Sequence, residues 1–206
     1  MTDAGEQPHK VRGWAQGVVQ TLRFALWHPS RLYGRPFTGA VDWRAIHFAI
    51  GVTALVPLAE QVLLYALIPL VNSMLPLPVL VLFLPPRLSA EELFRAVVLV
   101  PGMLPILLMV YAAVLHALLW LAESGERGYG VTLQCACFCM GSMVFRLLPY
   151  GGGYVAATWW LGLLAAGLHY GHGSPWHRVL PVVALHVAAF AWLVALANGW
   201  VDRPPL

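Results

Sequence analysis

Charged residues divide the chain into long apolar runs. Residues 45–86 contain a single charge, Glu60, and four later runs contain none: 96–122, 128–145, 147–177 and 179–201. An α-helix needs about 20 mainly apolar residues to cross the roughly 30 Å hydrocarbon core of a bilayer. The pattern therefore predicts five membrane-spanning helices, near residues 45–71, 96–121, 131–149, 154–170 and 179–199.

A distinct element precedes the first span. Residues 11–26 place apolar side chains, Trp14 among them, along one helical face, with Arg12 and Arg23 on the flank beyond it. Such a helix is expected to lie in the headgroup plane, with its basic edge toward lipid phosphates. The alternative is a helix that packs on the protein's own cytoplasmic loops.

The start of the second long helix carries a local signal. Ser89 is followed three residues later by Glu92, and Glu91 also lies in what would be the first turn. A serine at the N-cap and a glutamate at the third helical position form a capping box. We therefore expect a helix to begin at this point.

Composition agrees with this division of the chain. The 206 residues are 60% hydrophobic and only 10% charged, whereas a typical soluble domain is about 45–50% apolar and about 25% charged. These values exclude an ordinary soluble domain. The expected fold class is an all-α integral membrane protein, with an N-terminal arm over residues 1–44 and a five-helix transmembrane domain over residues 45–200.

The distribution of basic residues predicts the orientation. With a cytoplasmic N-terminus, the inner segments hold eight Lys and Arg residues and the outer segments hold four. An excess of basic residues on the cytoplasmic side is the general rule for membrane proteins. We therefore expect the C-terminus to be external. The net charge of +3 is small and no helical face of Arg and Lys follows the arm, so we expect no nucleic acid partner.

Several short motifs after residue 116 resemble a known family. They are His116, Gly125–Tyr129, Leu148–Gly153, the Trp159–Trp160 pair, Gly167–Leu168 and His172–Gly173, preceded upstream by Trp27–Tyr33. Their order resembles the bacterial branch of the Yip family, the Ypt/Rab-interacting membrane proteins. The resemblance implies five membrane helices, a cytoplasmic N-terminus, location in a bacterial inner membrane, and association with other membrane proteins or with itself.

Two charged residues inside the predicted spans need an explanation, because an ionisable group in a span costs about 2.5–3.5 kcal/mol on insertion scales. Glu60 lies near the middle of the first span, one turn after Pro57. It could carry a proton or bind a cation, or it could be a protonated side chain bonded to a carbonyl that Pro57 leaves free or to a neighbouring helix. Arg146 lies within a turn of the external surface, where it could extend to lipid headgroups.

Histidines gather toward one side of the predicted bundle. In the expected topology, His116, His169, His172 and His186 all map to the cytoplasmic leaflet. Imidazole is the commonest protein ligand for metals and can hold a haem iron from two helices. A metal or b-type haem at these residues is one hypothesis. The other is that the histidines are amphipathic residues suited to the membrane interface.

Motifs of common enzymes are missing from the chain. It has no P-loop, no GxSxG elbow and no HExxH sequence. We therefore expect a non-enzymatic accessory or organising subunit that binds membrane proteins or lipids. The alternative function is a cofactor-binding protein, or a proton or ion transporter, that uses Glu60 and the histidines.

Overall fold

The computed structural model describes residues 14–34, 40–74, 88–148 and 151–197. Within these ranges all regular secondary structure is helical. The elements in chain order are α1 (Trp14–Trp27), α2 (Pro29–Tyr33), α3 (Trp43–Met74), α5 (Ala90–Phe94), the π-helical turn η1 (Arg95–Leu99), α6 (Val100–Leu121), α7 (Tyr129–Cys139), the 3-10 helix η2 (Met140–Leu147), α8 (Gly152–His172) and α9 (Trp176–Ala197).

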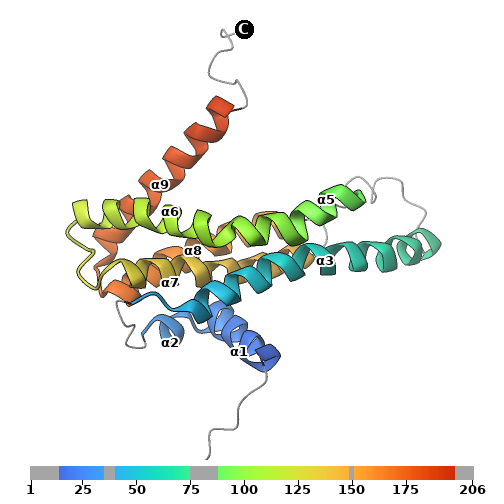
Figure 1. Ribbon diagram of the computed structural model, residues 1–206, viewed down its shortest axis with the longest axis horizontal. Helices are drawn as coiled ribbons and strands as arrows, with labels where there is room; N and C mark the ends of the chain where they lie inside the picture. The colour runs from blue at the N-terminus through green and yellow to red at the C-terminus, as the bar shows by residue number, and fades with distance from the viewer. Residues whose placement is uncertain (1–13, 35–39, 75–87, 149–150, 198–206) are drawn as a thin grey trace, which may run out of the picture.

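The helices form an elongated bundle, with α1 and α2 on one side and α9 on the other. In Figure 1, α3, α6, α7 and α8 run along one another, α1 and α2 lie against one side, and α9 diverges from the other side. One end of the bundle carries the start of α3, the end of α6 and the turn between α8 and α9; we call it the histidine end. We call the end near η2 and the start of α8 the arginine end.

Three helical segments of the described residues are long and apolar enough to cross a membrane. They are Trp43–Ala66, Ala90–Leu121 and Tyr129–Leu147, and they coincide with the first three predicted spans. The second combines α5, η1 and α6 into one continuous helix. The described chain is thus an all-helical protein with the character of an integral membrane protein.

The predicted helix start at Ser89 is confirmed. The Ser89 hydroxyl accepts a hydrogen bond from the Glu92 backbone N–H at 3.2 Å, and the Glu92 carboxylate accepts one from the Ser89 backbone N–H at 2.8 Å. Together these bonds satisfy two N–H groups that would otherwise lack a helical acceptor. They fix the start of α5.

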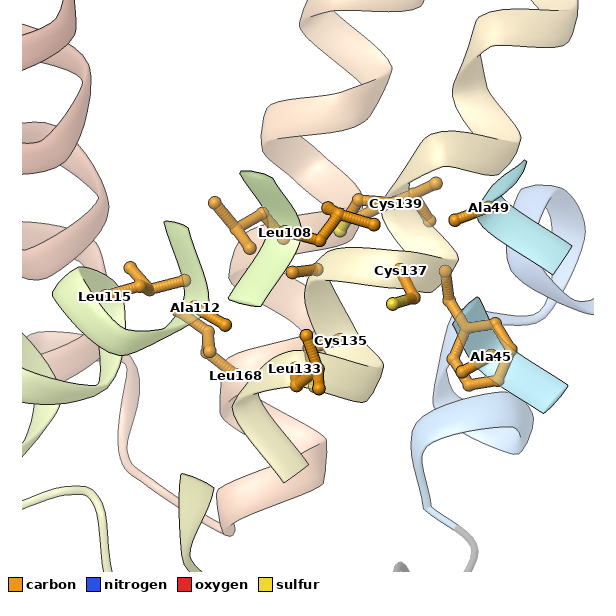
Figure 2. Packing of buried hydrophobic residues seen from close by; sticks show 14 of the residues in the cluster. Ala45, Ala49, Leu108, Ala112, Leu115, Leu133, Cys135, Cys137, Cys139 and Leu168 are labelled. Atoms are coloured by element: carbon orange, nitrogen blue, oxygen red, sulfur yellow. The ribbon is translucent and has the colours of Figure 1, made fainter. Parts of the chain in front are cut away.

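Helix α7 is the centre of the bundle. Every residue from Gly130 to Cys139 is buried, because α3, α6 and α8 all pack around this helix. Figure 2 shows Cys135, Cys137 and Cys139 along α7, with Leu108 and Ala112 of α6 on one side and Ala45 and Ala49 of α3 on the other. The three cysteines are free thiols and take part in the packing as small apolar groups.

A glycine allows α2 to reach this centre. A Cβ atom at Gly167 of α8 would lie 3.1 Å from the Tyr33 ring and 3.2 Å from Cβ of Cys135. Both distances are tighter than ordinary van der Waals contact. The Tyr33 side chain is fully buried, and its hydroxyl lies 3.9 Å from Sγ of Cys139. Tyr33 therefore anchors the N-terminal arm to α7 and α8.

Helix α1 also packs on the bundle. Its residues Leu22 and Ala25 lie within about van der Waals distance of a Cβ built at Gly141 of η2, at 3.4 and 3.6 Å. Elsewhere on the same helix Val19 is 65% and Trp27 69% exposed. Helix α1 thus contacts both α2 and η2. Its placement at the membrane interface stays a prediction.

Candidate functional site

Glu60 and Arg146, the two charged residues inside the predicted spans, lie together. Nη2 of Arg146 donates a hydrogen bond to Oε2 of Glu60 at 3.1 Å. The Glu60 side chain is 9% exposed and the Arg146 side chain 39%. Glu60 comes from α3 and Arg146 from η2, two elements with extensive mutual contact. The bond neutralises a buried carboxylate and joins the two elements.

One interpretation of Glu60 was a bond to a carbonyl near Pro57 or to a neighbouring helix, and the structure shows a bond to the neighbouring element η2. The other interpretation was a proton or cation site. The prediction for Arg146 was a contact with lipid headgroups. Neither prediction considered the other residue as the partner, because the two are 86 positions apart. The neighbouring Gln61 also has a structural bond: its Oε1 accepts a hydrogen bond from the Leu88 backbone N–H at 3.1 Å.

A second polar cluster lies at the histidine end. Oγ1 of Thr132 lies 2.9 Å from Nδ1 of His116 and 2.9 Å from Nε2 of His172. The hydroxyl can donate to one imidazole and accept from the other, since it has one proton and two lone pairs. The two rings lie 6.0 Å apart between centroids. One threonine of α7 thus links α6 to α8.

The electrostatics of this cluster favour neutral imidazoles. Burial, followed by the neighbouring His116 and Arg127, lowers the pKa of His172 to about 4. His172 is therefore neutral at physiological pH, which suits a ring bonded to a hydroxyl. Its other nitrogen, Nδ1, is buried and has no hydrogen-bond partner among the described residues.

The turns beside this cluster are bonded to each other. Arg127 donates to the Gly171 carbonyl at 3.0 Å, and the Ser174 hydroxyl donates to the Ser124 carbonyl at 2.9 Å. Arg178 donates to the Glu123 carbonyl at 2.7 Å. These bonds join the turn between α6 and α7 to the turn between α8 and α9, and so fix the two turns against each other at the histidine end.

The other predicted histidines take separate positions. Nδ1 of His169 lies 2.6 Å from the Ser174 carbonyl, and its ring stacks on Trp176 at 4.1 Å between centroids. His186 of α9 packs edge-on against Tyr111 of α6 at 4.8 Å. The structure therefore brings His116 and His172 together and places His169 and His186 in other contacts. Among the described residues no three His, Cys, Asp or Glu side chains form a group that could hold a metal ion.

The predicted membrane-interface residues are described only in part. Arg12 lies outside the described residues, and Trp14 is the first residue of α1. Arg23 lies on α1 and is exposed, as expected for the basic flank of that helix.

Sequence reasoning missed Thr132 and the Ser124–Ser174 pair. Thr132 stands three residues before Cys135 in an apolar run, and a threonine at such a position usually bonds its own helix. One signal was available. Thr132, near the start of the third predicted span, falls at about the same expected depth as His116, near the end of the second.

The comparisons with known proteins identify no relative: no protein-family model, curated protein or solved structure matches this chain. Its described residues form an all-helical fold with three helices long and apolar enough to cross a membrane. Its interior charges and its central histidine pair are bonded to groups of the same chain.

Proposed function

We propose that this chain is a polytopic membrane protein of Yip type that acts as a non-enzymatic accessory or organising subunit. In this proposal it resides in a bacterial inner membrane, with a cytoplasmic N-terminus and an external C-terminus. It binds other membrane proteins through the exposed face of the N-terminal arm, or through lipids around the bundle.

The ion pair between Glu60 and Arg146 carries this proposal. A carboxylate that transports protons or cations must be able to exchange them, whereas this carboxylate is buried and bonded to an arginine. Breaking such a pair by removal of one partner is strongly unfavourable. The bonds of Thr132 to His116 and His172 support a structural role for the histidines in the same way.

Five spans are part of the proposal. Helices α8 and α9 contain 21 and 22 residues, or about 32 Å each at about 1.5 Å per residue. That length matches the roughly 30 Å hydrocarbon core. With α8 and α9 added to the three segments above, the histidine end faces the cytoplasm and the arginine end faces outward.

Exposed apolar side chains of α1 form the proposed docking surface for a partner. Val19 and Trp27 are exposed there, while Leu22 and Ala25 hold the helix on the bundle. The test is in-cell crosslinking, followed by affinity purification in mild detergent and mass spectrometry. The double substitution Val19→Ser with Trp27→Ala should remove the crosslinked partners and leave expression and membrane insertion unchanged.

A matched control uses an exposed aromatic residue elsewhere. Tyr154 of α8 is 85% exposed, and Tyr154→Ala should leave the partner set intact. The organising role of the arm would be overturned if the α1 variant kept every partner, or if the control lost the same partners.

A further inference from the structure

A cavity of about 550 Å3 lies between η2, α8 and α9. Its walls are almost entirely apolar, with Met143 from η2, Trp160 and Leu161 from α8, and Val187 from α9. Gly153 and Ala157 of α8 also line it and are exposed, whereas Ala156 beside them is buried. The cavity is therefore reachable from the outer surface of the bundle, on the side where α9 diverges (Figure 1).

The inner limit of the cavity lies near the middle of the proposed membrane. Tyr111 stands ten residues before the end of α6 and His186 ten residues after the start of α9. At about 1.5 Å per residue Tyr111 lies about 15 Å from the histidine end along α6, and His186 lies at the same depth because its ring packs on that of Tyr111. Half of a roughly 30 Å hydrocarbon core is about the same depth.

The outer limit of the cavity lies at the arginine end. Arg146 is the next-to-last residue of η2 and Gly153 the second residue of α8, and both line the cavity. The cavity thus runs from one membrane surface to the midplane. That is the depth taken by the acyl chain of one lipid in one leaflet.

The rim of the cavity carries the Arg146 guanidinium. The Arg146 side chain is 39% exposed, and one of its nitrogens bonds to Glu60. A guanidinium has five N–H groups in a planar fork, more than this single bond uses. A phosphate at the membrane surface complements the fork, since arginine binds phosphate through two parallel bonds.

We propose that this cavity binds one anionic phospholipid, with an acyl chain between η2, α8 and α9 and the phosphate beside Arg146. The site rests on the proposed membrane placement of α8 and α9 and is independent of the organising role of the arm. A failure of lipid binding would therefore leave the crosslinking experiment on α1 unaffected.

Two glycines of α8 provide a matched pair of variants. A Cβ built at Gly153 or at Gly162 meets no atom within 4 Å, and both residues are exposed. Gly153 lines the cavity, whereas Gly162 is not among its lining residues. A Gly153→Leu side chain should occupy the space of the acyl chain, and Gly162→Leu should add the same bulk outside it.

The test is native mass spectrometry of delipidated protein incubated with phosphatidylglycerol or with phosphatidylcholine of the same acyl chains. Wild-type protein should retain one phosphatidylglycerol per chain, with about tenfold weaker retention of phosphatidylcholine, because the choline cation of that lipid offsets the charge of its phosphate and is repelled by Arg146. Gly153→Leu should lower phosphatidylglycerol retention about tenfold, and Gly162→Leu should change it less than about twofold.

The charge at the rim is tested separately by the double variant Glu60→Gln with Arg146→Gln. It should retain both lipids equally, because the acyl-chain cavity remains and the phosphate partner is gone. Equal retention of the two lipids by wild-type protein would overturn the proposal. Equal losses in the two glycine variants would overturn it as well.

Discussion

At the residue scale, Thr132 connects two helices through one hydroxyl. Its oxygen lies 2.9 Å from nitrogens of both His116 and His172. Because the threonine is fully buried, no solvent molecule can easily replace its hydroxyl as the partner of the two imidazoles. A buried polar group that loses its partner costs about 1–3 kcal/mol.

Thr132→Val should therefore destabilise the protein, since valine keeps the shape and removes the hydroxyl. We expect the free energy of unfolding in detergent to fall by about 1–3 kcal/mol, because both imidazoles lose a bond. Thr132→Ser should retain most of the stability. The exposed Thr158 of α8 provides the control, and equal effects of Thr132→Val and Thr158→Val would contradict the role assigned to Thr132.

The low pKa of His172 predicts a dependence of stability on pH. The folded protein holds this ring neutral down to a pKa of about 4, whereas an unfolded histidine takes up a proton near pH 6.5. Between these values the unfolded state binds more protons, so stability is complete above about pH 6.5 and falls as the pH drops toward 4.

The expected loss across this window is at most about 3 kcal/mol. It is measured as the free energy of unfolding at a series of pH values. His172→Gln can still bond to Thr132 but does not titrate, so its stability should change less with pH. The same steep slope in this variant would assign the effect to other groups, such as the neighbouring His116.

At the scale of elements, the Glu60–Arg146 pair joins α3 to η2. The 3-10 helix η2 also packs against α1 and against α8. An ion pair at this position fixes how α3 lies against the rest of the bundle. Because Glu60 is more buried than Arg146, loss of the arginine should do more harm than loss of the glutamate.

A double-mutant cycle tests this pair. Arg146→Gln should lower the free energy of unfolding by about 3 kcal/mol, the lower end of the range for a broken buried pair, because Glu60 is left without its partner. Glu60→Gln should cost less, and the double variant should recover much of the loss. Additive losses in the double variant would show that the two residues act independently.

What the sequence could predict depended on how local each signal is. The three long apolar helices and the start of α5 follow from neighbouring residues, because apolar length and a capping box are local properties. The pairing of Glu60 with Arg146 and the contacts of Thr132 depend on how α3, α6 and α8 are rotated against α7 and η2. No periodicity within one helix contains that information, and the apolar cavity beside α9 is missed for the same reason.

At the scale of the whole molecule, the ion pair and the histidine cluster are bonded within the chain. Glu60, Arg146, His116 and His172 all have partners on a different helix, so they hold the helices together. The proposed surfaces for other molecules are the exposed side chains of α1 and the cavity beside α9. Charged and histidine side chains are thus bonded inside the bundle, while the side chains of α1 and the cavity beside α9 are accessible from outside. This arrangement is the physical basis of the proposed organising role.

The most direct measurement of that role uses the variant Glu60→Gln with Arg146→Gln. The pair is structural in this account, so the uncharged variant should keep the full set of crosslinked partners found with wild-type protein. Proteoliposomes that contain either protein and a trapped pH-sensitive dye should have equally low proton permeability. A proton flux that wild-type protein supports and the double variant loses would contradict the account and identify Glu60 as a transport residue.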